Sequence, residues 1–390
     1  MKVSRRSLLV NSAAAASVSV AGVGPATMQT GQDDQPDEAE DAGGARAGAR
    51  TWPSPSLKAL AAAKGMRFGS SFDRQVFQHP VYAQALKSEA AVLTPESGFY
   101  WSTIRPTMHS FDFLLADRLA GFANSNGMAL RGHALVWHKV LAPGFDASTK
   151  SVPAMKQMER HINAVAGYYK DRVESWVVVN EAIQPTPDRA DGLRDGAFLR
   201  EAGPDYIAAA FKMAHAAAPN AELVYNDWFS MTSSPFAERR RTALLKLIDS
   251  LKASGAPVHA IGLQSHLHAG KEVFAEGIWR DFCARIRSAG LTVHLTELDV
   301  GDEGLPADPA RRDPAIADYA RRYLDVTLGS ARVRDVTVWG MTDRYSILDR
   351  NAPRSDGLMP RGAPYDSDFN AKPLRQAIAA ALQAAPAFKA

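Results

Sequence analysis

Short apolar runs alternate with longer amphipathic segments from residue 57 onward, and this alternation limits the chain to few folds. The candidate strands cover residues 66–72, 90–93, 128–137, 173–180, 222–226, 258–264, 292–296 and 335–339. Runs that are apolar at every position, such as Val177-Val178-Val179, are typical of strands buried on both faces of a parallel sheet. Helical patterns separate the strands, and the clearest cover residues 113–122, 207–218, 237–251 and 316–328.

Eight strand–helix units predict an α/β fold, a (β/α)8 or TIM barrel, in a single catalytic domain. The competing architecture is a doubly wound open sheet. Such a sheet usually carries a Gly-rich phosphate turn after an early strand. The sequence has no turn of that kind, so the barrel is favoured.

The first 55 residues have a different character. Arg5-Arg6 precedes a mildly apolar, Ala-rich stretch, and small residues follow near Pro25, which predicts a twin-arginine signal peptide over residues 1–28. The stretch is too short and too rich in Ser and Ala for a membrane span, so we expect no stable membrane anchor. Residues 29–55 are acidic and Gly/Ala-rich and predict a linker. The barrel domain then covers residues 56–390 of an exported protein, periplasmic or secreted.

The composition limits the kinds of site and partner that the chain can have. Cys283 is the single cysteine, which excludes an intrachain disulfide and a thiolate metal cluster. Lys and Arg number 45 against 42 Asp and Glu, too balanced to suggest a nucleic-acid partner. No dinucleotide or phosphate motif appears, so we expect no cofactor and no metal, and we expect a monomer.

Polar side chains close nearly every predicted strand. In barrels of this kind, catalytic groups sit at the carboxyl ends of the strands. A ring of carboxylates and imidazoles there is better explained by an active site than by core stability. In strand order the residues are Asp73, Glu96, His133 with His138, Asn180 with Glu181, Asn226 with Asp227, Gln264 with His266, Glu297 with Asp299, and Trp339 with Asp343.

Two of these residues indicate a reaction. Glu181 closes the fourth predicted strand and Glu297 closes the seventh, and we expect these strands to face each other across the barrel mouth. Glycoside hydrolysis uses a pair of carboxyl groups as catalytic residues, one as acid/base and one as nucleophile. A network with His266 and Asp299 would keep Glu297 ionised and oriented as nucleophile. Glu181 follows Asn180, an amide suited to a sugar hydroxyl, and fits the acid/base role.

The chain resembles glycoside hydrolase family 10, the β-1,4-xylanase family, over roughly residues 57–383. Six segments in order carry the resemblance: residues 131–138 (RGHALVWH), 178–182 (VVNEA), 225–227 (YND), 262–266 (GLQSH), 296–299 (TELD) and 338–340 (VWG) followed by Asp343. The resemblance implies a retaining glycosidase that cuts internal β-1,4 linkages of a polysaccharide, with xylan the expected substrate.

The resemblance also implies roles for individual residues. Glu181 would be the acid/base and Glu297 the nucleophile, oriented by His266 and Asp299. Asn180 would bind the 2-hydroxyl of the reacting sugar, and Trp339 would form an aromatic floor beneath it. Glu96, His133, Trp137 and Gln264 would complete the substrate-binding set.

Four positions depart from the family pattern. The family's Glu-Asn-Glu-Met-Lys-Trp segment reads Glu96-Ser97-Gly98-Phe99-Tyr100-Trp101, so Ser97 and Tyr100 replace Asn and Lys. Val140 replaces a Gln, and Ile347 stands where a second Trp is usual. We expect these changes on the glycone side of the cleft. They leave open a different or decorated β-glycan, such as a bacterial exopolysaccharide, as the substrate.

Two other classes of function compete with this hypothesis. The His266-x-His268 pair could belong to a metal-dependent barrel hydrolase, but metal barrels favour such a pair on an early strand. A non-catalytic carbohydrate-binding protein would need no intact pair of glutamates. Glu181, Glu297, His266 and Asp299 are all present, which favours an enzyme.

Overall fold

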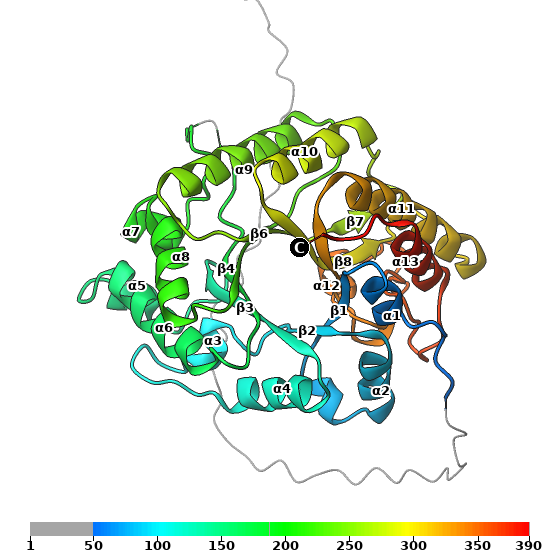
Figure 1. Cartoon of the computed structure of the whole chain (residues 1–390), viewed down its shortest axis with the longest axis horizontal. Coiled ribbons are helices and arrows are strands. Elements are labelled where there is room, and N and C mark those ends of the chain that lie inside the picture. Colours follow the sequence, from blue (N-terminus) through cyan, green and yellow to red (C-terminus); the bar gives the residue numbers. More distant parts are fainter. Residues whose placement is uncertain (1–49, 187, 390) are drawn as a thin grey trace, which may run out of the picture. The chain divides into compact units, whose positions relative to one another are not determined.

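The computed structural model describes residues 50–186 and 188–389 (Figure 1). The predicted signal peptide and residues 29–49 of the predicted linker lie outside the described residues. Thr51–Ala390 form one compact unit. Its first helix, α1, begins at Leu57, and the hydroxyl of Ser56 caps it by accepting the amide N–H of Ala59.

Eight parallel strands close into a barrel, as the sequence predicts. Each barrel strand pairs with the next, β6 pairs with β8 and β9 returns to β1. The ninth strand, β7, pairs only with the end of β8. The strands are β1 (Arg67–Phe72), β2 (Val92–Pro95), β3 (Ala129–Trp137), β4 (Ser175–Asn180), β5 (Glu222–Asp227), β6 (Ala260–Leu263), β7 (His266–His268), β8 (Thr292–Gly301) and β9 (Val333–Val338).

The observed strands differ from the predicted ones by a few residues at their ends, and two of these differences affect the site. The strand predicted over residues 258–264 is shorter, and a break at Gln264 and Ser265 separates β6 from β7. Ser265 has a φ of 66°, a left-handed conformation that interrupts regular pairing. The strand predicted to end at residue 296 continues to Gly301, because its end pairs with β7. Glu297 and Asp299 therefore lie on a hydrogen-bonded strand rather than in a loop.

Helices surround the barrel (Figure 1). The helices are α1 (Leu57–Ala62), α2 (Pro80–Glu89), α3 (Trp101–Ile104), α4 (Leu114–Ser125), α5 (Phe145–Ser148), α6 (Ala154–Tyr168), α7 (Ala197–Ala202), α8 (Tyr206–Ala217), α9 (Pro235–Ala253), α10 (Glu276–Ser288), α11 (Pro309–Ser330), α12 (Leu348–Asn351) and α13 (Pro373–Ala384), with 3-10 turns η1 (Arg74–Phe77) and η2 (Asp343–Tyr345). The four predicted helices correspond to α4, α8, α9 and α11. Helix α9 begins with Pro235 after Ser234, whose hydroxyl accepts the N–H of Ala237 at 3.2 Å.

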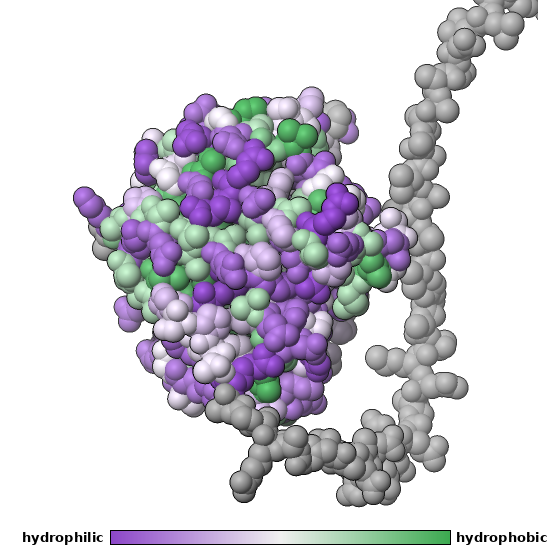
Figure 2. All heavy atoms as spheres, turned by 90° about the vertical axis from the view of Figure 1, so that its right-hand side faces the viewer, coloured by the Kyte–Doolittle hydropathy of each residue, from purple (hydrophilic) through white to green (hydrophobic). Residues whose placement is uncertain are grey.

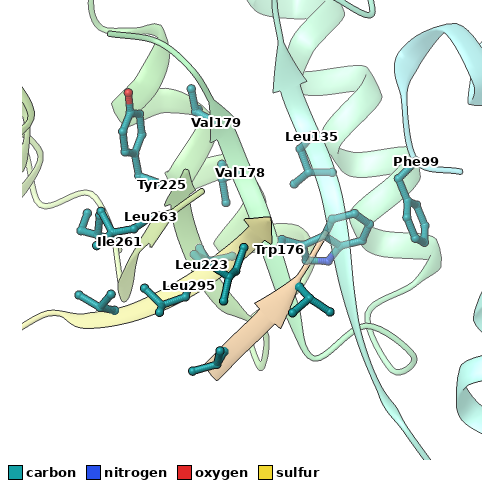
Figure 3. Packing of buried hydrophobic residues seen from close by; sticks show 14 of the residues in the cluster. Phe99, Leu135, Trp176, Val178, Val179, Leu223, Tyr225, Ile261, Leu263 and Leu295 are labelled. Atoms are coloured by element: carbon teal, nitrogen blue, oxygen red, sulfur yellow. The ribbon is translucent and has the colours of Figure 1, made fainter. Parts of the chain in front are cut away.

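The apolar core fills the space between strands and helices. Trp176 of β4 packs edge-to-face on Phe99, with ring centroids 5.2 Å apart, and Leu135 lies on the adjacent strand (Figure 3). Gly132 of β3 makes room for this indole, because a Cβ there would fall 2.1 Å from the Trp176 ring. The close fit fixes β3 and β4 side by side below the strand ends that carry Trp137, Asn180 and Glu181.

A charged network occupies the barrel interior. Asp335 of β9 accepts two hydrogen bonds from Arg67 at 2.8 Å and is also bonded by Arg131 of β3. The Nδ1 atom of His294 lies 3.1 Å from the same carboxylate. Strands β3 and β9 are separated by β1 and β2, so these side chains meet across the interior. Burial opposes ionisation of Asp335, but the neighbouring cations outweigh it and hold its pKa well below the ordinary value.

Hydrophilic and hydrophobic residues are interspersed on the surface shown in Figure 2. The long helices turn their apolar sides inward. In α11, for example, Ile316, Ala320 and Leu324 are buried. Within the described residues, no helix has the length and apolar character needed to cross a bilayer.

Candidate active site

The predicted site residues come together in one cleft of about 740 Å³ at the carboxyl ends of the strands. All ten line it, although they were identified on six different predicted strands. They are Glu96, His133, Trp137, Asn180, Glu181, Gln264, His266, Glu297, Asp299 and Trp339.

Glu297 is held by a donor on each carboxylate oxygen. The Nδ2 of Asn226 donates to Oε1 at 2.7 Å, and the Nε2 of His266 lies 3.2 Å from Oε2. Burial alone would raise the pKa of Glu297. The hydrogen bond and charge of His266 and the other neighbours outweigh burial, so its pKa is lowered. Glu297 is therefore a buried carboxylate that stays ionised, as a nucleophile requires.

His266 links the two carboxylates of β8. Its Nδ1 lies 2.8 Å from Oδ1 of Asp299, and its Nε2 faces Glu297. Burial alone would lower the pKa of His266, but Asp299 and Glu297 raise it well above the ordinary value. The protonated imidazolium can donate from both nitrogens at once and fix the orientation of Glu297.

Glu181 faces a different environment. Its Oε1 accepts from Nε2 of Gln264 at 3.3 Å, and its Oε2 lies 3.2 Å from Nζ of Lys139. The backbone of Glu181 has a φ of 55°, which few non-glycine residues adopt. Its N–H donates to the carbonyl of Asn226 at 2.9 Å and its carbonyl accepts from Arg194 at 2.7 Å, so both backbone groups hold the strained residue in place.

The two glutamates are not diametrically opposed. Strands β5 and β6 lie between β4 and β8, whereas four strands separate them on the other side of the ring. The two intervening strands supply amides that connect the glutamates. Gln264 donates to Glu181 and, at 3.2 Å, to Oδ1 of Asn180, and Asn226 donates to that same oxygen at 2.9 Å and to Glu297. A continuous hydrogen-bonded path therefore joins the predicted acid/base to the predicted nucleophile.

The side-chain amide of Asn180 has a donor group without a partner among the described residues. Its Oδ1 accepts twice, but its buried Nδ2 has no hydrogen-bond partner among the described residues. A buried N–H without a partner costs free energy unless a ligand satisfies it. A sugar hydroxyl at the cleft would do so.

Aromatic rings form the wall beside Glu181. Trp339 packs on His133 with centroids 5.6 Å apart, and Tyr100 packs on Trp137 at 5.4 Å. The buried Nε1 of Trp137 also has no partner among the described residues. Rings with polar edges can pack on the C–H face of a sugar and still bond its hydroxyls.

Glu96 is an unusual carboxyl group. It accepts from the hydroxyl of Ser71 at 2.7 Å. Burial, with the charge of Asp73 adding to it and the Ser71 bond opposing it, raises the pKa of Glu96 to about 7. At neutral pH, Glu96 can therefore donate as well as accept a hydrogen bond.

Three of the four divergent positions line the cleft. Ser97, Tyr100 and Ile347 do so, whereas Val140 does not. The Ser97 hydroxyl is bonded to Asp73, and Val140 contributes its carbonyl to the N–H of Ser102 at 3.0 Å. The prediction of four clustered changes is therefore supported by geometry for three positions only.

Four polar residues at predicted strand ends lie outside the cleft lining, and one of them is Asn226, the donor to Glu297. Asp227 is buried in an ion pair with Arg240 at 2.6 Å, and Asp343 binds Lys372 at 2.7 Å. His138 contributes to a separate small cavity beside Arg194. Asp227 and Asp343 also accept backbone N–H groups of neighbouring loops, from Ile183 at 3.1 Å and from Ala363 at 3.0 Å.

Two functional candidates were not singled out from the sequence. Asn226 is among the predicted strand-end residues, but the sequence does not indicate its bond to Glu297. Lys139, half-exposed beside Glu181, is not among the predicted residues. Its position directly after His138 at the end of β3 was the signal for it. Arg74, Trp228 and Arg350 also line the cleft.

The metal-dependent alternative finds no support in the side-chain geometry. Both ring nitrogens of His266 face carboxylates of β8. In the part of the chain that the structure describes, no group of three or more His, Cys, Asp or Glu is arranged to hold a metal ion.

Comparison with known sequences gives a consistent result. The model of glycosyl hydrolase family 10 matches residues 56–381. Endo-1,4-beta-xylanase B of Paenibacillus barcinonensis is 32% identical over 310 residues, which cover 76% of this chain and 89% of that protein. Endo-1,4-beta-xylanase A of Caldicellulosiruptor sp. (strain Rt8B.4) is also 32% identical, over 309 residues that cover 74% of this chain. The chain spans only 43% of the length of that second relative.

Solved structures share the fold. The native xylanase 10B of Thermotoga maritima superposes with a TM-score of 0.75 at 28% identity, over 84% of this chain and 98% of that one. Xylanase XynB of Paenibacillus barcinonensis, complexed with a conduramine derivative, gives 0.73 at 29% identity, over 83% and 98%.

Proposed function

The chain belongs to glycosyl hydrolase family 10 and is a glycoside hydrolase, and from this premise we propose that it is a retaining endo-β-1,4-xylanase with Glu181 as acid/base and Glu297 as nucleophile. The observation that carries the assignment is the contrast between the two glutamates. Glu297 has a donor on each oxygen and a lowered pKa. Glu181 lines the cleft with only one amide and one half-exposed lysine as side-chain partners.

In the first step, the Glu297 carboxylate attacks the anomeric carbon of a xylose unit while Glu181 gives its proton to the leaving glycosidic oxygen. The C–O bond of the substrate breaks, a glycosyl ester on Glu297 forms, and the shortened chain leaves as an alcohol. Asn226 and His266 orient the attacking oxygens, and Asn180 Nδ2 is placed to donate to the sugar 2-hydroxyl.

In the second step, Glu181, now ionised, removes a proton from water, and the hydroxide oxygen attacks the anomeric carbon. The ester bond breaks, Glu297 is released as a carboxylate and Glu181 regains its proton. Two inversions give net retention. Nζ of Lys139, 3.2 Å from Oε2 of Glu181, faces this carboxylate.

Azide rescue of alanine variants tests the two roles. In Glu297→Ala, azide attacks the substrate directly and inverts the anomeric carbon once, giving an α-glycosyl azide from an aryl β-xylobioside. In Glu181→Ala, the ester on Glu297 still forms from a substrate with a good leaving group, and azide then gives the β-product. Rescue with the opposite stereochemistry would exchange the roles, and no rescue of either variant would overturn them.

A glycan panel tests the substrate. The purified protein should release short oligosaccharides from xylan, and Glu297→Ala should release none. An inert xylan together with cleavage of another β-glycan would retain the two-glutamate mechanism and reject the xylanase proposal. Sugar binding without turnover of any glycan would reject the enzyme.

Export by the twin-arginine route is part of the proposal. Arg5-Arg6 before the Ala-rich stretch supports it. Replacement of both residues by Lys should retain the protein in the cytoplasm of an expressing cell. Unchanged export of this variant would reject the twin-arginine assignment.

A further inference from the structure

A second groove lies outside the catalytic cleft and shares no lining residue with it. It has a volume of about 400 Å³ and is formed by the segments after β2 and β3 together with the start of α6. Helices α3, α5 and α6, which flank these segments, lie together on one side of the barrel (Figure 1). Loops that follow barrel strands are on the same end of the fold as the catalytic groups.

The lining of this groove is basic. Arg105, His109, Lys156 and Arg160 contribute to it, and none of the described residues that line it is acidic. Lys156 has an exposed partner, Glu159, at 2.7 Å, and Arg160 donates to the carbonyl of His109 at 3.2 Å. The net charge of the side chains that line the groove is therefore positive, which favours the binding of an anion.

Arg105 is the unusual member of this group. Its side chain is 1% exposed, and its Nε and Nη1 have no hydrogen-bond partner among the described residues. The guanidinium carbon lies 5.1 Å from the ring centroids of both Trp101 and Phe111, and Nη2 donates to the Met108 carbonyl. Burial and the charge of Arg160 lower the pKa of Arg105 to about 10. A buried guanidinium without a carboxylate is costly unless a ligand supplies one.

The start of α6 adds a second source of positive potential. The helix has 15 residues and follows Pro153, and no side chain caps its first turn. Val152, Lys156 and Gln157, on either side of this helix start, line the groove. The N–H groups of Lys156 and Gln157 donate to the carbonyl of Pro153, so this helix start contributes its dipole rather than free N–H groups.

We propose that this groove binds a carboxylate-bearing sugar unit, with the carboxylate on the side of Arg105 and Arg160. The volume lies within the range of small-molecule sites, about 300–1,000 Å³, and far exceeds what an inorganic oxyanion fills. Pro143 and Val152 offer apolar surface for the sugar ring, and the Ser148 and Ser151 hydroxyls offer acceptors for its hydroxyl groups. An acidic polysaccharide could thus be held beside the cleft without occupying it.

Titration of the purified full chain with methyl β-glucuronoside, methyl β-glucoside and inorganic phosphate tests this proposal. The glucuronoside should bind, and the neutral glucoside should bind at least tenfold more weakly, because it lacks the carboxylate. Arg105→Met should weaken glucuronoside binding at least tenfold. The double variant Lys156→Gln/Arg160→Gln changes two exposed side chains of α6 and removes the Arg160 bond to the His109 carbonyl, and it gives the same test if Arg105→Met does not fold.

Arg239→Gln is the matched control, since Arg239 is an exposed arginine of α9 away from this groove. It should bind the glucuronoside like the unmodified protein, and so should Trp339→Ala, which alters the catalytic cleft. Equal binding of glucoside and glucuronoside, binding of phosphate alone, or loss of binding in Trp339→Ala would each overturn the proposal. Cleavage of neutral xylan by the groove variants is measured separately, so failure of this proposal is distinguishable from failure of the xylanase proposal.

Discussion

Asn226 of β5 reaches across β6 to donate a hydrogen bond of 2.7 Å to Glu297 of β8. Gly262 of β6 makes this reach possible, because a Cβ at that position would lie 2.2 Å from Oδ1 of Asn226. The same Oδ1 accepts from the hydroxyl of Thr296 at 2.7 Å, which fixes the amide so that its N–H groups face Asn180 and Glu297. A residue without a side chain thus determines where the donor to Glu297 lies.

Asn226→Ala should lower kcat/KM on xylan about ten- to a hundredfold, since a hydrogen bond to a charged group contributes roughly 1.5–3 kcal/mol. The loss of a donor to the charged form should also raise the pKa of Glu297. In the proposed mechanism the ionised form of Glu297 attacks, so the acidic limb of the pH profile should move to higher pH. An acidic limb at the unmodified position would show that Asn226 does not stabilise the carboxylate.

Gly262→Ala should reduce activity by at least tenfold, because the added methyl group displaces Asn226. The residues that contact Glu297 are themselves unchanged in this variant. Gly121→Ala in α4 is the matched control, since its Cβ would meet no atom within 4 Å. The control should keep full activity and gain about 0.5–1 kcal/mol in the free energy of unfolding. Activity assays and urea denaturation of both proteins check this. Equal activity of the two variants would contradict the spacer role of Gly262.

The barrel was predictable from the sequence because its strands are continuous apolar runs and its helices are amphipathic, both local properties of the chain. Ten of the residues that line the cleft were predictable because the topology brings strand ends together. The contact between Asn226 and Glu297 was not predictable. It depends on the missing side chain at Gly262 and on a strand order that places β6 between β5 and β8. The extension of β8 to Gly301 was also missed, because it depends on pairing with the short β7.

At two other strand ends, buried carboxylates resemble catalytic residues in the sequence but are not part of the cleft. Asp227 and Asp343 follow strands as catalytic residues do, but Arg240 and Lys372 neutralise them behind the cleft. Both partners lie far along the chain or on helices, so sequence spacing does not reveal these pairs. Arg105 is the opposite case, because it is a buried cation without a carboxylate partner. The sequence does not reveal this, since it depends on how the side chains pack.

Glu96→Gln should change how stability depends on pH. Because the pKa of Glu96 is raised to about 7 in the folded protein, the folded state binds more protons than the unfolded state between about pH 4.5 and 7. The free energy of unfolding therefore falls as pH rises through this window. Glu96→Gln should remove about 2–3 kcal/mol of that decrease between pH 5 and pH 8. Urea denaturation at pH 5 and pH 8 measures it, and identical pH dependence in both proteins would refute the raised pKa.

Asp335→Asn should be the most destabilising of these changes. The amide keeps the shape of the carboxylate but leaves Arg131, which is fully buried, without its counter-charge. Removal of one partner from a buried ion pair costs about 3–5 kcal/mol. Asp325→Asn is the control, because its pair with Arg321 at 2.7 Å lies on the surface of α11 and should contribute under about 1 kcal/mol.

The pH dependence of this variant provides a second readout. Because the pKa of Asp335 is held well below its ordinary value, its contribution to stability is present at pH values above about 3.8 and is lost as pH falls below that value. The unmodified protein should therefore lose stability in acid more steeply than Asp335→Asn. Urea midpoints measured from pH 3 to pH 7 check this. Parallel curves for the two proteins would show that the interior network does not depend on the charge of Asp335.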